Sequence, residues 1–330
     1  MDIGPSPVYD KSILFDGVDE YLDIGTAATW DSLIGGSAAN AKAYSYSMWF
    51  KPENGGDIPP VLLNFGSLDR QLLLDGAVYP NPLKALNGPS PSSNGQITSN
   101  TTFNTGTWYH VVVTYTGGWH SVGNFKIYVN GVDDSGTETL ASDGPAPIAG
   151  GNCTIGGILL ANNSKGNICD VAVWNRELTA AEVTLLYNGG ERTDINSTVP
   201  RNLLSWWKIG DGSGDSSDSS DPAARINDEA IGGTRDATPV NTESGDIELD
   251  SPPMTIPVGW NSLIGGSGAD AKAYSYSMWW KRTGLPEAFP RLISFGNSDR
   301  ALFYQNTTNR LIATNSTVNG HCVRTTNTFS

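Results

Sequence analysis

A long internal repeat is the feature that most constrains the fold of this chain. The 22 residues WDSLIGGSAANAKAYSYSMWFK at 30–51 return at 260–281 as WNSLIGGSGADAKAYSYSMWWK, with 18 identical positions and a constant offset of 230. The same offset relates LNFGSLDR at 63–70 to ISFGNSDR at 293–300. Self-similarity of this length predicts a duplicated domain.

The two copies differ in extent. The first copy is followed by TWYHVVVTY, FKIYVNGVDD and NICDVAVWNRELTAAEVTLLYNGG, whereas the second stops at TTNTFS, which parallels SNTTFN at 99–104. We therefore predict one domain over 1–250 and a partial second repeat over 254–330. Either the natural chain continues past Ser330, or another element supplies the strands that the second repeat lacks.

Composition narrows the class of protein. The 330 residues include 20 basic and 34 acidic side chains, for a net charge of −14, together with 38 glycines and only 16% charged residues. Because acidic residues outnumber basic ones, the chain cannot neutralise a run of phosphates, and we predict no nucleic-acid partner. The chain contains no run of 18 apolar residues, so we predict no membrane insertion. The first ten residues, MDIGPSPVYD, show no secretory signal.

Alternating side chains predict many short strands. In TWYHVVVTY (107–115) the aromatic and branched residues alternate over two faces, with Val111 and Val113 on one of them, and YSYSMWF (44–50) alternates in the same way. The Asn130-Gly131 pair predicts a two-residue hairpin turn.

One helix is expected in an otherwise β-rich chain. Thr179 and Glu182 form a capping box before an apolar run, which predicts a helix over 179–188. Many short strands, glycine-rich turns and one helix are typical of a β-sandwich. The polar stretch 210–253 is typical of a linker, but the strand-like LLSWWKIG before it does not fit a linker.

Three cysteines, Cys153, Cys169 and Cys322, are too few for a disulfide scaffold. Cys153 and Cys169 lie in two strand-like runs joined by a polar loop, and would face one another if these runs formed a hairpin. Two alternatives stay open: buried free thiols, which a reducing site of synthesis favours, or one disulfide.

Catalytic patterns are missing from the sequence. There is no GxSxG elbow, HExxH motif or Walker loop, and His110 in an alternating strand is better explained as a structural histidine. The carboxylates of Glu248-Leu-Asp250 lack the third acidic residue of the glucanase pattern Glu-x-Asp-x-x-Glu. We therefore predict no catalytic residues and no enzymatic activity.

Five motifs occur in the order found in one family. FDGVDEYLDIG, SYSMWFK, TWYHVVVTYTG, FKIYVNGVDD and GNICDVAVWNRELTAAEVTLLYNGG cover roughly 12–190 and resemble the concanavalin A-like, laminin-G-like jelly-roll domains. The resemblance implies an all-β jelly-roll sandwich, duplicated here with an incomplete second copy. LLSWWKIGDGSGD resembles the opening strand of such domains, which suggests a circular permutation in which 203–212 fills the first-strand position.

The resemblance also implies a calcium site. Its matching positions are Asp16 of the FDG motif and Asp170, although Cys169 stands where the family often has a second acidic residue. The alternative is that Asp16 caps a turn and Asp170 makes a surface hydrogen bond. A second acidic set, predicted to be a solvated loop and not a metal site, comprises Asp211, Asp215, Asp218 and Asp221.

Trp119 in the glycine-rich stretch TGGWHSVGN is the tryptophan expected to be exposed, so we predict it as a glycan-binding residue. Lectin-like sites use such aromatic platforms.

The sequence leaves two candidate functions, a virion structural protein and a glycan-binding adhesin. The repeated, permuted arrangement with its ESGDI segment resembles virion structural proteins of marine bacteriophages, which implies a capsid, tail or fibre component located in the virion. Its partners would be other copies of the chain or other virion proteins. The alternative is an extracellular or cell-surface, calcium-assisted adhesin that recognises cell-surface glycan. Function on a fold of this kind rests on analogy.

Overall fold

The computed structural model describes residues 11–55, 59–66, 70–76, 80–88, 95–139, 145, 147–158 and 162–249, and the backbone of 291–295, 300–305, 310–314 and 322–324. The chain divides into two compact units, Met1–Ile256 and Pro257–Ser330. The boundary predicted from the sequence, between 250 and 254, stays a prediction. The repeated segment 260–281 lies outside the described residues.

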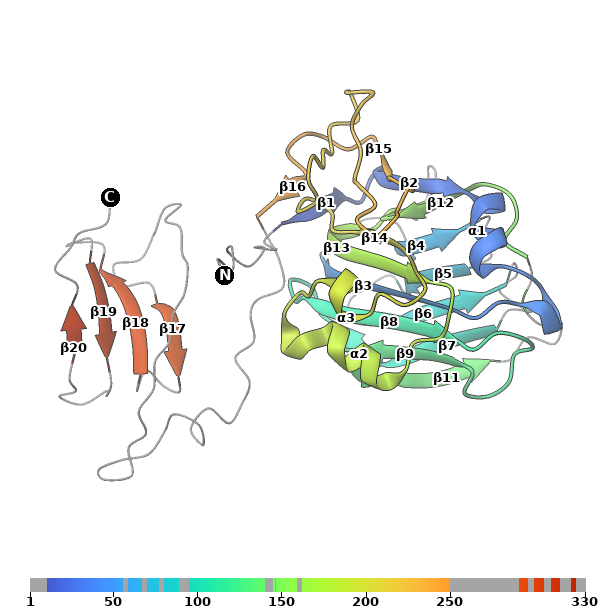
Figure 1. Cartoon of the computed structure of the whole chain (residues 1–330), viewed down its shortest axis with the longest axis horizontal. Coiled ribbons are helices and arrows are strands. Elements are labelled where there is room, and N and C mark those ends of the chain that lie inside the picture. The colour runs from blue at the N-terminus through green and yellow to red at the C-terminus, as the bar shows by residue number, and fades with distance from the viewer. Residues whose placement is uncertain are drawn as a thin grey trace. The chain divides into compact units, whose positions relative to one another are not determined.

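Unit 1 is a sandwich of two antiparallel sheets, as the sequence predicted (Figure 1). Sheet A has the order β10-β9-β8-β3-β13-β1-β16, and β14 also pairs with β13. Its strands are β1 (Ser12–Asp16), β3 (Tyr44–Pro52), β8 (Tyr109–Tyr115), β9 (Phe125–Val129), β10 (Val132–Asp133), β13 (Lys165–Trp174), β14 (Leu203–Trp207) and β16 (Ile247–Glu248).

Sheet B has the order β11-β7-β6-β5-β4-β12-β2-β15. Its strands are β2 (Tyr21–Thr26), β4 (Val61–Phe65), β5 (Arg70–Leu74), β6 (Asn81–Asn87), β7 (Gly95–Phe103), β11 (Ser135–Thr139), β12 (Asn152–Ile155) and β15 (Thr238–Val240).

The main core lies between the two sheets. The face of β8 that carries Val111 and Val113, predicted to share one side of the strand, is buried there, together with Tyr46 of β3 and Phe65 of β4. Trp30 of helix α1 (Ala27–Ile34) packs edge-on against Phe65, with ring centroids 5.1 Å apart. Burial of such large apolar side chains is the dominant favourable term in folding.

A second apolar layer covers the outer face of sheet A. Helices α2 (Ala180–Tyr187) and α3 (Ile195–Thr198) contribute Val183, Leu186 and Ile195 to a buried cluster with Val112 of β8 and Trp174 of β13. β8 is therefore buried on both faces. The remaining helical segments are two short 3-10 helices, η1 (Ala38–Asn40) and η2 (Asn188–Gly190).

Two local predictions are confirmed. The Thr179 side chain accepts a hydrogen bond from the Glu182 N–H while the Glu182 side chain accepts from the Thr179 N–H, so α2 begins with a capping box. Asn130 and Gly131 join β9 to β10 with φ values of 49° and 80°, the positive values that this two-residue turn needs.

The two cysteines do not share a hairpin. Cys153 lies in β12 of sheet B and Cys169 in β13 of sheet A, and both are buried free thiols. Of the two alternatives that the sequence left open, the free thiols are therefore correct for this pair. The hairpin on which a facing pair depended does not form, because β12 and β13 belong to different sheets.

β1 and β14 lie end to end along one edge of β13. Ile13 of β1 is opposite Ile168, and Trp207 of β14 is opposite Val171. The register of β13 against β3 shifts between Cys169 and Ala172, which marks a β-bulge.

Unit 2 contains a four-stranded antiparallel sheet with the order β17-β18-β19-β20. Its strands are β17 (Arg291–Phe295), β18 (Arg300–Gln305), β19 (Arg310–Thr314) and β20 (Cys322–Arg324). In unit 2 Phe295 is opposite Arg300, and in unit 1 Phe65 is opposite Arg70. Both residues of the second pair recur in the first at the offset of 230 that relates the two sequence repeats. Both strand pairs also have a register shift, after Arg291 in unit 2 and after Val61 in unit 1.

Candidate functional site

The loop 116–124 joins β8 to β9 and presents an aromatic ring to solvent. The Trp119 residue is 51% exposed, which confirms its predicted exposure, whereas Trp30, Trp174 and Trp206 are at most 1% exposed. A large exposed apolar side chain on a loop offers a flat surface to a ligand.

The backbone on both sides of Trp119 is held in place. The Gly118 N–H donates to the Ala41 carbonyl at 2.8 Å, and the Tyr115 hydroxyl donates to the Gly118 carbonyl. The Trp119 carbonyl accepts from the Asn124 side-chain amide at 2.8 Å. Because these bonds order the loop before any ligand arrives, binding would pay little further conformational entropy.

The residue after Trp119 anchors the loop to sheet B. His120 Nε2 lies 2.9 Å from the Asn87 side-chain nitrogen of β6, and its ring packs edge-on against Tyr115. A Cβ on Gly95 of β7 would lie 1.9 Å from the His120 ring, so any other residue there would displace the ring from this position. Burial, with the nearby Arg70 charge, lowers the pKa of His120 to about 4, so its Nε2 can accept from the amide at neutral pH.

Asp16 ends β1 and caps the turn that follows. Its Oδ1 accepts from the Val18 N–H at 2.7 Å, and its own N–H donates to Glu20 Oε2 at 2.6 Å. Glu20 is only 5% exposed, and this burial, with Asp246 and Asp16 nearby, raises the pKa of its carboxyl group to about 8. Asp16 thus has the turn-capping contact that was the alternative to a calcium ligand.

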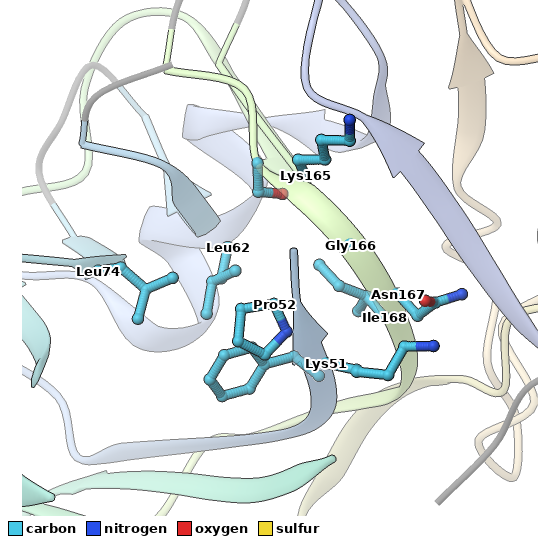
Figure 2. A pocket seen from close by; sticks show the side chains of 10 residues that line it. Lys51, Pro52, Leu62, Leu74, Lys165, Gly166, Asn167 and Ile168 are labelled. Atoms are coloured by element: carbon cyan, nitrogen blue, oxygen red, sulfur yellow. The ribbon is translucent and has the colours of Figure 1, made fainter. Parts of the chain in front are cut away.

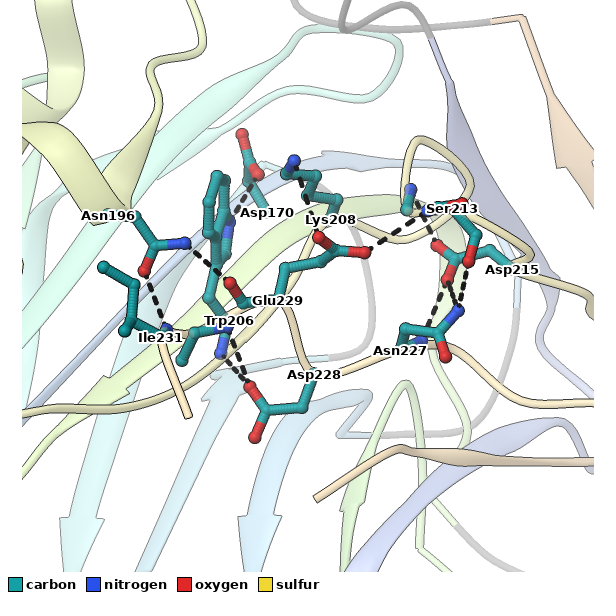
Figure 3. Close-up of polar contacts among 12 residues, drawn as sticks. Asp170, Asn196, Trp206, Lys208, Ser213, Asp215, Asn227, Asp228, Glu229 and Ile231 are labelled. Carbon is teal, nitrogen blue, oxygen red and sulfur yellow. Dashed lines mark hydrogen bonds and ion pairs between the residues drawn. The ribbon is translucent and has the colours of Figure 1, made fainter. Parts of the chain in front are cut away.

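Asp170 is buried at the bulge of β13, with a φ of 51°. Its Oδ2 accepts from Arg192 Nε at 2.7 Å and its Oδ1 from Trp206 Nε1 at 2.8 Å. Figure 3 shows the bond from Trp206. The expectation of a surface hydrogen bond is wrong, because this carboxylate belongs to an ion pair whose side chains are 2% and 4% exposed.

The structure does not bring the two predicted calcium residues together. In the register of β1 against β13, Asp16 is opposite Lys165 at one end of the ladder. Asp170 lies beyond the other end, past the opposed residues Ile13 and Ile168. Among the described residues, no group of three or more His, Cys, Asp and Glu side chains is placed to hold a metal ion. Calcium binding stays a prediction.

The acidic stretch after β14 is folded onto unit 1 by its own carboxylates. Asp215 accepts from the N–H groups of Gly210, Gly212 and Asn227 at 2.8–3.1 Å. Glu229 pairs with Lys208 at 3.8 Å, and Figure 3 shows both contacts of this carboxylate, one to Lys208 and one to the Ser213 N–H. Hydrogen-bonded turns of this kind differ from a flexible linker.

The remaining acidic side chains of this stretch also bind within unit 1. Asp218 and Asp221 accept from N–H groups two residues further along, and Asp211 lies 2.6 Å from Arg192 Nη1. The predicted loop is therefore ordered by local caps and one buried ion pair.

Two cavities in unit 1 are too small for a sugar. One lies where β3 ends and β13 begins, between Pro52, Ile168 and the residues Leu62 and Leu74 (Figure 2). The other lies under α2, against Ser47. Each has a volume of about 10 Å³, which is room for about one water molecule.

Three important residues were missed by the sequence analysis: Arg192, His120 and Glu20. Arg192 and His120 bind partners 22 and 33 positions away, which no local pattern relates to them. Glu20 follows Asp16 by four residues, and the acidic run FDGVDE could have suggested a carboxyl group with a raised pKa.

No helix in the described part of the chain is long and apolar enough to span a membrane.

Comparison with known families gives one match. The family described as the concanavalin A-like lectin/glucanases superfamily matches residues 17–184. No curated protein matches the chain.

Among solved structures, a protein of Bacteroides ovatus to which carbohydrate binding has been ascribed is similar over 77% of this chain, with a TM-score of 0.53 and 20% identity. The present chain covers 63% of that protein, so it spans less than two thirds of its length. At this identity the likeness shows the fold alone.

Two further structures are less similar. A heptameric pentraxin of Limulus polyphemus matches over 56% of this chain and 84% of its own, with 18% identity and a TM-score of 0.39. Domain 4 of an extracellular arabinanase from Geobacillus stearothermophilus, solved with arabinotriose, matches over 44% and 66%, with 22% identity and a TM-score of 0.30.

Proposed function

The chain belongs to the concanavalin A-like lectin/glucanase superfamily, and from this membership and the geometry of loop 116–124 we propose that unit 1 is a non-enzymatic glycan-binding module. The proposal is carried by one observation, the exposed ring of Trp119 on a backbone that is hydrogen-bonded at both neighbouring peptide groups. Ser121 of the same loop adds a hydroxyl group that can bind a sugar hydroxyl, whereas the Asn124 amide is engaged within the loop by Trp119 and Ser121.

The charge of the chain narrows the ligand class. With a net charge of −14, the protein repels anionic ligands at a distance. We therefore propose neutral glycans in preference to sialylated or sulfated ones.

Binding of the full chain to an array of neutral and sialylated glycans tests the proposal, followed by calorimetry with the best neutral ligand. Trp119→Ala should weaken binding at least about tenfold, equivalent to roughly 1.4 kcal/mol, and Trp119→Phe should keep part of the affinity. Val122→Ala is the matched control, because Val122 is 82% exposed on the same loop. Equal affinity of wild type and Trp119→Ala, or no glycan bound by the wild type, would refute the proposal.

Calcium assistance is a separate part of the proposal. It rests on the family resemblance at Asp16 and Asp170, and the structure adds no joint site for the two. Glycan binding measured with calcium and then with a chelator tests it. Unchanged affinity after chelation would remove calcium from the account.

A role as a virion structural protein is the other candidate from the sequence. It rests on the resemblance of the repeated arrangement and its ESGDI segment to phage proteins, and none of the three similar structures above is described as a virion protein. Light scattering of the full chain at two concentrations tests it. A large discrete oligomer would favour a packing role, and a monomer would favour the glycan-binding module.

A further inference from the structure

The bulge in β13 leaves a polar cavity on the outer face of sheet A. Ser47 and Trp49 of β3, His110 of β8 and Asp170 of β13 line it, and Leu186 of helix α2 lies against it. The bulge falls between Cys169 and Ala172, the partners of Trp49 and Ser47, so an extra residue stands where a regular ladder would close the gap.

Two polar atoms at this cavity lack a hydrogen-bond partner within the described structure. They are Ser47 Oγ and His110 Nδ1, on residues that are 1% and 3% exposed. Buried polar atoms in folded proteins are nearly always paired, with protein or with ordered water, because leaving one unpaired costs about 1–3 kcal/mol. The Asp170 carboxylate at this cavity already accepts one bond on each oxygen and retains further acceptor capacity. The Thr193 hydroxyl, which also lines the cavity, is already bonded to Thr198 Oγ1 at 2.8 Å.

A serine, a histidine and an aspartate around one cavity also raise the question of a catalytic triad. A triad needs the histidine bonded to both other groups. Here Ser47 Oγ and His110 Nδ1 are both unpartnered, and Asp170 is paired with Arg192. The geometry is therefore not that of an activated nucleophile.

The cavity volume is about 10 Å³, which is room for about one water molecule. From this volume and the unpaired atoms, we propose that the cavity holds one ordered water molecule that bonds to Ser47 Oγ, His110 Nδ1 and the Asp170 carboxylate. Three partners are typical of buried water.

The proposed water suits the chemistry of all three groups. Burial lowers the pKa of His110 to about 3, so the ring is neutral and its Nδ1 can accept or donate according to tautomer. Water can donate to a carboxylate and either accept from or donate to a hydroxyl. It would connect β3, β8 and β13 beneath α2 at the point where the bulge interrupts their ladder.

A crystal structure of the full chain at about 1.6 Å or better tests the proposal directly. A density peak within about 2.6–3.2 Å of both Ser47 Oγ and His110 Nδ1 is expected.

A matched pair of variants tests it in solution. Thr114 Oγ1 is also buried and unpartnered on sheet A, but Thr114 does not line the cavity. Thr114→Val removes a hydroxyl that has no partner within the described structure and does not line the cavity, so the thermal midpoint should stay or rise. Ser47→Ala takes a partner from the water, so its midpoint should fall below that of the wild type.

Support requires both results, the density peak and the lower midpoint of Ser47→Ala relative to Thr114→Val. An empty cavity in the crystal, or a Ser47→Ala protein as stable as Thr114→Val, would overturn the proposal. Neither readout involves glycan binding, so the result is independent of the proposed function.

Discussion

Replacing Arg192 should destabilise unit 1 more than any surface substitution. Its guanidinium donates to Asp170 Oδ2 at 2.7 Å, to Asp211 Oδ2 at 2.6 Å, and to the carbonyls of Lys11 and Lys208 at 2.8 and 2.9 Å. The arginine side chain is 2% exposed and the two carboxylates are 4% and 5% exposed. One guanidinium is thus paired with two buried carboxylates.

The expected cost follows from what Arg192→Met leaves behind. Both carboxylates stay buried, where Trp206 Nε1 still donates to Asp170 and the Lys11 N–H still donates to Asp211, but the buried positive charge is gone. Removing one partner of a buried ion pair costs about 3–5 kcal/mol. At about 2–4 °C per kcal/mol for a domain of this size, the thermal midpoint should fall by roughly 6–20 °C.

Urea denaturation of the full chain, followed by tryptophan fluorescence and circular dichroism, measures the effect. Arg225→Met is the matched control, because Arg225 is 55% exposed and lies 3.8 Å from Asp236. That variant should lose less than about 1 kcal/mol. Adding Asp170→Asn and Asp211→Asn to Arg192→Met should recover part of the loss by removing the buried charges.

The reasoning would be refuted if Arg192→Met were as stable as Arg225→Met, to within about 0.5 kcal/mol. Such a result would mean that water or a rearranged side chain replaces the guanidinium at low cost.

Three further substitutions test smaller features. Burial raises the pKa of Glu20 to about 8, so the folded state holds the proton more tightly than the unfolded state, and stability should fall as the pH rises from about 4.5 through 8. The urea midpoint of Glu20→Gln should not show this decrease with pH. Burial lowers the pKa of His120 to about 4, so its contribution to the free energy of unfolding is complete above about pH 6.5 and is lost as the pH falls towards 4. The urea midpoints of His120→Gln should lack this loss. The same decrease at acid pH in wild type and His120→Gln would contradict the role of His120 in holding the loop. Thr179→Ala removes the cap of α2 and should cost about 1 kcal/mol; an unchanged urea midpoint would mean that packing alone fixes the helix.

Local patterns predicted the features that depend on neighbouring residues. The turn at Asn130-Gly131 and the cap formed by Thr179 and Glu182 each depend on two to four consecutive residues, and both are present. Alternation in 109–115 predicted which residues share a face of β8, and one of these faces is in the main core. It could not show that the outward face is buried too, because α2 and α3 come more than 60 residues later.

The roles of the acidic residues could not be predicted in the same way. The sequence shows Asp170 beside Cys169, but its partners Arg192 and Trp206 come 22 and 36 positions later. A buried ion pair and a metal site use the same residue types, so sequence alone does not separate them. For Trp119 a glycine-rich loop was sufficient to predict exposure, whereas the anchoring of His120 on Asn87 requires both sheets.

The pairing of β16 with β1 determines how unit 1 can be joined to other proteins. Ser12 is opposite Glu248, so the first and last strands of the unit lie side by side, with Cα atoms about 5 Å apart. A polypeptide that enters and leaves at one point can be placed within a surface loop of a host protein without stretching that loop. Unit 1 therefore has the geometry of an insertable cassette, and a fusion that joins 12 and 248 to the two sides of a host turn should leave both folds intact.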